Sequence, residues 1–113
     1  MNIQSKRNIQ KIRELNDSFR QTGIGGQILY TNGIKGHGPE FLRRCMQAVS
    51  AFDEFTEDND PHREHDFGKC TVEGTDIFWK IDYYDTSMQY ASPNPAVEAI
   101  TCRVMTVMLI EEY

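Results

Sequence analysis

Apolar side chains alternate with mixed aromatic and charged ones over residues 76–84, and this pattern constrains the fold more than any other in the sequence. Successive side chains of a β-strand point to opposite faces of the sheet. One face of this strand would therefore carry Ile77, Trp79, Ile81 and Tyr83, and the other Phe78, Lys80, Asp82 and Tyr84. This pattern predicts a strand with one face on an apolar core and a second face of mixed aromatic and charged residues.

A second strand is expected over residues 69–73, because Cys70 and Val72 alternate there with polar residues. The tripeptide Glu73-Gly74-Thr75 supplies the turn of a hairpin between the two strands. A further short strand is expected over residues 27–31, followed by the turn dipeptide Asn32-Gly33.

Three segments have helical periodicity. Apolar residues recur on one face over residues 5–19 and again over residues 39–55, where Pro39 suits a first helical turn. Residues 95–112 are apolar nearly all round, with Arg103 as the sole charge between Glu98 and Glu111. We expect a third helix there, packed centrally or against a second copy of the chain through residues 97–110.

These elements predict an α+β fold in the order α-β-α-β-β-α. A small, mainly antiparallel sheet of three strands would be packed with three helices. A chain of 113 residues is expected to form a single compact domain over residues 1–113. No apolar run approaches the length of a membrane span, so we expect a cytoplasmic protein without membrane contact.

The formal net charge is −5, and the two halves of the chain carry charges of opposite sign. Residues 1–50 contain eight Lys/Arg and three acids, whereas residues 51–113 contain four Lys/Arg and fourteen acids. Seven of those acids fall in the polar, turn-rich segment 53–66. Phosphate contacts need Lys and Arg, so this balance argues against direct nucleic-acid binding overall, although the basic first half leaves it open.

Basic residues also recur at helical spacing near the N-terminus. Lys6, Arg13 and Arg20 lie seven residues apart and would form a stripe beside the apolar face of the first helix. The expected role of this stripe is a solvated flank whose aliphatic stems cover the edge of the core.

The cysteine and histidine spacing gives no sign of a metal or another cofactor. Cys45, Cys70 and Cys102 are widely separated, and three histidines complete no zinc-binding motif. We therefore expect free thiols, no metal site and no cofactor.

Polar residues that can carry chemistry gather in residues 58–66 and on the strand after the turn. A catalytic role would use Glu64, His65, Asp66, Lys80 and Asp82 as a general acid–base or cation site. The same region can instead form a protein-binding surface made of Asp58, Asp60, Glu64, Asp66, Asp82, Tyr83, Tyr84 and Asp85. A structural role is the third alternative and the favoured one for the segment 58–66, whose side chains would cap turns and satisfy the loop backbone. Tyrosines in an acidic frame suit a protein partner better than stacked bases.

Four segments resemble a small bacterial family of unknown function that is common on plasmids and other mobile elements of proteobacteria. They are residues 11–17 (KIRELND), 59–68 (NDPHREHDFG), 78–85 (FWKIDYYD) and 103–113 (RVMTVMLIEEY). The resemblance brings no catalytic residues. It implies an accessory protein of mobile DNA, and small acidic proteins of that kind can inhibit host defence systems.

The leading hypothesis is therefore a non-enzymatic protein that binds, and inhibits, a protein or nucleic-acid-handling complex. A small hydrolytic or metal-dependent enzyme is the second hypothesis. An oligomer-forming scaffold is the third.

Overall fold

The computed structural model describes residues 3–113, with side chains from residue 8 onward. Its elements follow one another as α1 (Ile3–Thr22), β1 (Gly26–Tyr30), α2 (Asn32–Gly36), α3 (Pro39–Ala51), β2 (Phe67–Val72), β3 (Thr75–Tyr84), η1 (Glu98–Ile100), β4 (Cys102–Leu109) and η2 (Ile110–Glu112). The α+β class, the first two long helices and the hairpin are confirmed. Within the described residues no helix is long and apolar enough to cross a membrane.

The sheet has four strands in the order β1-β4-β3-β2, not the three that the sequence predicts. β2, β3 and β4 pair antiparallel, while β1 pairs parallel to β4. The prediction of a mainly antiparallel sheet thus holds for two of the three pairings. The segment after β1 also differs from prediction, because Asn32-Gly33 begins the short helix α2 instead of a hairpin turn.

The helix expected over residues 95–112 is wrong, because its centre is strand β4. β4 lies between β1 and β3 and pairs with both. A central strand is apolar on both faces, and over a short stretch this resembles a buried helix. The β-branched residues Val104, Thr106 and Val107 favour the strand. The oligomer contact expected through residues 97–110 is argued from this helix, so that argument no longer applies.

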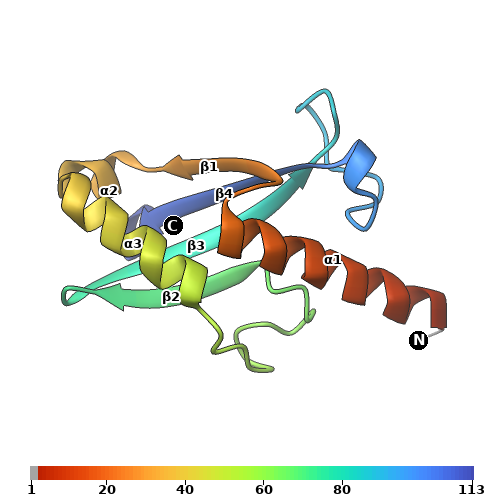
Figure 1. Cartoon of the computed structure of the whole chain (residues 1–113), viewed down its shortest axis with the longest axis horizontal. Helices are drawn as coiled ribbons and strands as arrows, with labels where there is room; N and C mark the ends of the chain where they lie inside the picture. The colour runs from red at the N-terminus through yellow and green to blue at the C-terminus, as the bar shows by residue number, and fades with distance from the viewer. Residues whose placement is uncertain (1–2) are drawn as a thin grey trace.

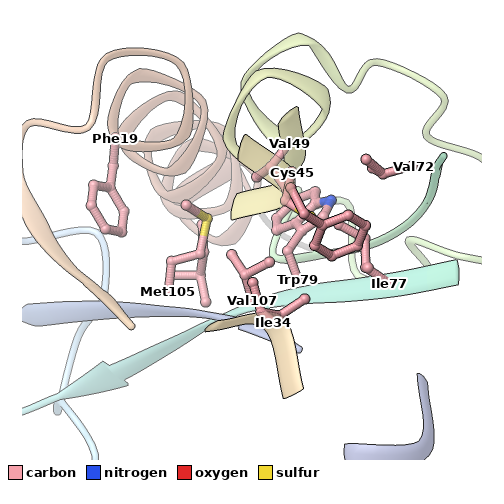
Figure 2. Packing of buried hydrophobic residues seen from close by; sticks show 11 residues of the cluster. Phe19, Ile34, Cys45, Val49, Val72, Ile77, Trp79, Met105 and Val107 are labelled. Atoms are coloured by element: carbon pink, nitrogen blue, oxygen red, sulfur yellow. The ribbon is translucent and has the colours of Figure 1, made fainter. Parts of the chain in front are cut away.

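The molecule has two layers, with the helices on one face of the sheet. Figure 1 looks through the layers, with α1 and α3 in front of the strands. Figure 2 shows the core between helices and sheet, where Phe19 of α1 and Cys45 and Val49 of α3 point toward Trp79, Met105 and Val107. As predicted, Ile77, Trp79 and Ile81 face this core and are buried.

Trp79 needs a glycine beside it. Gly68 is its partner in the β2–β3 register, and a Cβ on Gly68 would lie 2.5 Å from the indole nitrogen. The missing side chain therefore lets the largest core residue lie across the neighbouring strand. The hairpin turn at Glu73-Gly74 has positive φ at both residues (50° and 79°), as a two-residue turn that matches the strand twist requires.

No α-helix of residues 3–113 packs against the other face of the sheet, which we call the open face. It is mixed aromatic and charged, as the alternation predicts. Lys80 and Asp82 form an ion pair there (3.0 Å), each with 39% of its side chain exposed. The open face consists of residues Gln27, Leu29, Phe67, Lys69, Thr71, Asp76, Phe78, Lys80, Asp82, Tyr84, Cys102, Val104, Thr106 and Met108. Val104 and Met108 of the central strand β4 are nevertheless buried, so most of the exposed part of this face lies on the other strands.

The chain returns over one end of the open face. Tyr113 packs edge-on against Phe67 and Phe78, with ring centroids 5.9 and 5.3 Å away. Glu112 holds this turn by accepting hydrogen bonds from the Thr31 hydroxyl (2.6 Å) and the Gly33 amide (3.1 Å). Aromatic side chains therefore gather at this end of the face.

All three cysteines are free, as predicted. Burial raises the pKa of the Cys45 and Cys70 thiols to about 11 each. Both thiols are therefore neutral packing groups at physiological pH.

Replacing Gly68 with alanine should destabilise the fold by about 1–3 kcal/mol, because the new methyl group displaces the Trp79 ring from the core. Chemical denaturation followed by circular dichroism measures the difference. Gly36→Ala is the matched control, because nothing lies within 4 Å of a Cβ at that position. Equal stability of the two variants would contradict the close approach of Trp79 to Gly68.

Candidate functional site

The polar residues that the sequence singled out lie where the segment between α3 and β2 meets α1. The backbone of this segment has positive φ at two residues other than glycine, Arg63 (59°) and His65 (55°). Such angles persist only where surrounding contacts hold them. Those contacts come from the Asp60 carboxylate and from three side chains of α1, namely Arg13, Asn16 and Asp17.

Asn16 is fully buried and joins three parts of the chain. Its amide nitrogen donates to the backbone oxygen of Glu64 (2.9 Å) and to the Tyr83 hydroxyl (2.8 Å). Its amide oxygen accepts from Nε of Arg103 (2.7 Å). One side chain thus ties α1 to the segment before β2, to β3 and to β4.

The groups around Asn16 complete a closed network. The Tyr83 hydroxyl donates to the Glu64 carboxylate (2.7 Å), and Arg103 donates to the backbone oxygen of Pro95 (2.6 Å). Burial raises the pKa of the Tyr83 phenol, and the hydrogen bond to Glu64 raises it further. Tyr83 therefore stays protonated and remains a donor.

Arg20 is buried and closes the C-terminal end of α3. Its Nη1 donates to the backbone oxygens of Val49 (2.9 Å), Ser50 (3.1 Å) and Phe52 (2.9 Å). The last carbonyls of a helix lack partners within the helix and favour a nearby cation. The guanidinium carbon also lies 5.3 Å from the centre of the Trp79 ring. The expected solvated stripe is therefore wrong at Arg20, while the Lys6 side chain lies outside the described residues.

His65 lies between two carboxylates. Its Nδ1 is 2.8 Å from Oδ1 of Asp17, and its Nε2 is 3.6 Å from Oδ2 of Asp60. The ring stacks on Phe55 with a centroid distance of 3.6 Å. Asp17 also pairs with Arg20 (3.1 Å), so the histidine and the helix-capping arginine share one carboxylate.

Asp66 is half-buried among other acids. Burial raises the pKa of its carboxyl group, and the charges of Glu64 and Asp60 raise it further, while His62 opposes the shift. The charged form of Asp66 is therefore less favourable in the folded chain than in water.

The five candidate catalytic residues do not come together. Glu64 and His65 contact groups on the helix side of the sheet. Lys80 and Asp82 alternate with Ile81 and Tyr83 and so lie on the open face, where they pair with each other. The sheet separates the two halves of the cluster.

The candidate partner-binding residues divide in the same way. Asp60, Glu64 and Tyr83 make the internal contacts described above, and Asp66 is half-buried beside them. Asp58 is exposed in the segment before β2. The Asp85 carboxylate accepts bonds from Ser87 and from the amides of Gln89 and Tyr90, and so closes a turn after β3. Asp82 and Tyr84 lie on the open face.

Sequence reasoning missed the role of Asn16, Asp17, Arg20 and Arg103. Arg103 carried a signal, because it is the one charge in an apolar run and such a charge is buried only when it is paired. Asn16 and Asp17 gave no signal of their own. Among the described residues, no group of three or more His, Cys, Asp or Glu side chains could hold a metal ion.

The fold and the network define a small α+β protein whose four-stranded sheet is covered by helices on one face. Residues 30–112 match the model of the family described as "Protein of unknown function (DUF3768)". The match covers more than half of the chain, so the protein belongs to this family. The expected family of unknown function is thereby confirmed. Neither the curated proteins nor the solved structures contain a match.

Arg20→Met should lower the free energy of unfolding by about 2–4 kcal/mol, because three backbone oxygens at the end of α3 lose a charged donor. Urea denaturation measures the change. Arg43→Met is the control, because Arg43 is exposed and pairs only with Glu40 on the surface. A loss no larger than that of the control would show that Arg20 does not hold α3.

Asp66→Asn should stabilise the protein at pH 7 and leave its stability unchanged at pH 3. A raised carboxyl pKa means that the folded chain holds this proton more tightly than the unfolded chain does. Its contribution to stability therefore falls as the pH rises through that pKa, and the amide removes the loss. Thermal unfolding at both pH values measures the effect, with exposed Asp58→Asn as control. Stabilisation at pH 3 alone would contradict the burial of Asp66.

Proposed function

We propose that this protein is a non-enzymatic binding protein that engages a protein partner through the open face of its sheet. One observation carries the proposal, namely that helices cover one face of the sheet and leave the other with partly exposed aromatic and charged side chains. Leu29 is 51% exposed and Tyr113 75% exposed on or beside this face.

The chemistry of the open face suits a protein surface. Tyrosine and phenylalanine supply large contact areas at low entropic cost, and they are enriched among interface anchors. Here Phe78 and Tyr84 on β3 flank the ion pair of Lys80 and Asp82. Mixed charges beside aromatic anchors give a partner both apolar contact and a fixed orientation.

The polar network supports a binding role over a catalytic one. Glu64 and His65 are engaged in internal contacts, and the sheet separates them from Lys80 and Asp82. A catalytic site needs its groups to converge on one cavity.

Fewer acidic side chains are available for binding than the sequence-based hypothesis of an acidic surface assumes. Asp60 is buried against His65, and Glu64 accepts the bond from Tyr83. Asp53, Glu54, Glu57 and Asp58 stay exposed. These four acids can contribute long-range attraction to a basic partner, while the open face supplies the contact.

In this proposal the chain is an accessory protein of mobile DNA, as the resemblance implies. Its partner belongs to a nucleic-acid-handling complex of the host, which it inhibits. The balance of four Lys/Arg against fourteen acids in residues 51–113 supports such a partner, because proteins that bind DNA present basic surfaces.

The double variant Lys80→Ala/Tyr84→Ala should reduce partner recovery at least tenfold. Each removed side chain contributes contact area on the open face, and central interface residues typically cost more than 1 kcal/mol when truncated. The measurement is affinity capture of tagged protein from an extract of the native host, quantified by mass spectrometry.

The matched control is Arg43→Ala/Gln47→Ala, which truncates two exposed residues of α3 on the helix side. A genuine partner is recovered equally by the wild type and by this control. Equal recovery by both double variants, or loss with the α3 variant alone, would contradict binding through the open face. Melting curves of all three proteins verify that each is folded.

A further inference from the structure

A cleft of about 600 Å³ lies between α1 and the segment before β2, on the helix side and away from the open face. Gln10 and Arg13 of α1 line it from one side, and His62 and Arg63 line it from the other. Ile9 and Pro61 add apolar surface. Its volume lies in the range of ordinary small-molecule sites.

Two guanidinium groups in this cleft have no acidic partner. Neither Arg13 nor Arg63 forms an ion pair with any carboxylate whose side chain the structure describes, and the first seven residues contain no acid. Lys11, Lys35 and Arg103 likewise form no ion pair among the described residues, whereas Arg20, Arg43 and Arg44 each pair with a carboxylate.

The fold positions the Arg13 side chain and the backbone at Arg63, whereas the exposed Arg63 side chain makes no hydrogen bond among the described residues. Nη1 of Arg13 donates to the backbone oxygen of Arg63 (3.3 Å), which leaves its other N–H groups free. The backbone at Arg63 is left-handed (φ 59°). Its amide donates to the backbone oxygen of Asp60 (3.1 Å), and the next backbone oxygen, that of Glu64, accepts from Asn16 (2.9 Å). A preformed arrangement of donors binds an anion at a lower entropic cost.

We propose that this cleft binds the phosphate group of a small organic phosphomonoester. Arginine presents a planar set of donors that fits phosphate oxygens in pairs, and the His62 ring and the Gln10 amide add further donors. Ile9 and Pro61 would contact the organic part of the ligand. The binding of a phosphomonoester goes beyond the proposed protein-binding function and uses different residues.

The surrounding acids restrict the ligand to a small one. Glu64 also lines the cleft, and its carboxylate accepts a hydrogen bond from Tyr83. The two arginines also line a second cleft of about 350 Å³, together with Glu57 and Asp60. These carboxylates would repel the successive phosphates of a nucleic-acid backbone more strongly than a single phosphate group.

Titration of the ¹⁵N-labelled full chain with ribose 5-phosphate tests the site. At constant ionic strength, amide shifts are expected to saturate at Gln10, Arg13, His62 and Arg63 and to stay small elsewhere. Arg13→Gln/Arg63→Gln should weaken the binding at least tenfold, whereas Lys35→Gln on exposed α2 should leave it within twofold. Arg63→Gln alone serves as a second variant, because Arg63 is exposed and its side chain makes no hydrogen bond in the described structure.

Inorganic phosphate and a single-stranded oligonucleotide are the other two probes. If inorganic phosphate binds the same residues more weakly than ribose 5-phosphate, the cleft also recognises the organic part of the ligand. If both bind equally, the cleft recognises the phosphate group alone, and free phosphate is a sufficient ligand. Either result supports the phosphate site. Shifts that persist in the double variant, no saturable shift with any probe, or tighter binding of the oligonucleotide would overturn the proposal.

Discussion

The guanidinium group of Arg20 is the interaction on which most of this structure depends. It closes the C-terminal end of α3, lies over Trp79 in the centre of the sheet and pairs with Asp17 on its own helix. Through Asp17 it also reaches His65 and so the segment before β2. A buried charge is costly unless its donors find partners, and Nη1 and Nη2 of Arg20 find them on α3 and Asp17 while its Nε is buried without one. The helix-covered side of the molecule is therefore specified by polar contacts as much as by apolar packing.

This network determines which acidic side chains of residues 53–66, the segment before β2, are exposed. Seven acids within 53–66 suggest one negative surface. Instead, the Asp60 carboxylate accepts the backbone N–H of left-handed His65, the Glu64 carboxylate accepts from Tyr83, and Asp66 is half-buried. The fold thereby leaves Arg63 exposed and Arg13 partly exposed in a chain of negative net charge. Local structure, and not overall charge, decides which ions each surface can attract.

Sequence patterns predicted what depends on local periodicity. The alternation in β3 and the helical face of residues 39–55 were sufficient for the hairpin, for α3 and for the core position of Trp79. They failed for β4, because a strand buried on both faces has no period that distinguishes it from a helix. They also missed Asn16 and Arg20, whose roles depend on partners far away in sequence. No spacing rule connects Arg20 with the carbonyl groups at residues 49–52.

Helices cover one face of the sheet and leave the other without a helix layer. Paramagnetic broadening by a soluble gadolinium chelate tests this arrangement, measured on side-chain signals along β3 in dilute protein. We expect clear broadening at the partly exposed Lys80 and Tyr84 on the open face and little at buried Ile77, Trp79 and Ile81. Equal protection on both faces, at protein concentrations that exclude self-association, would contradict it.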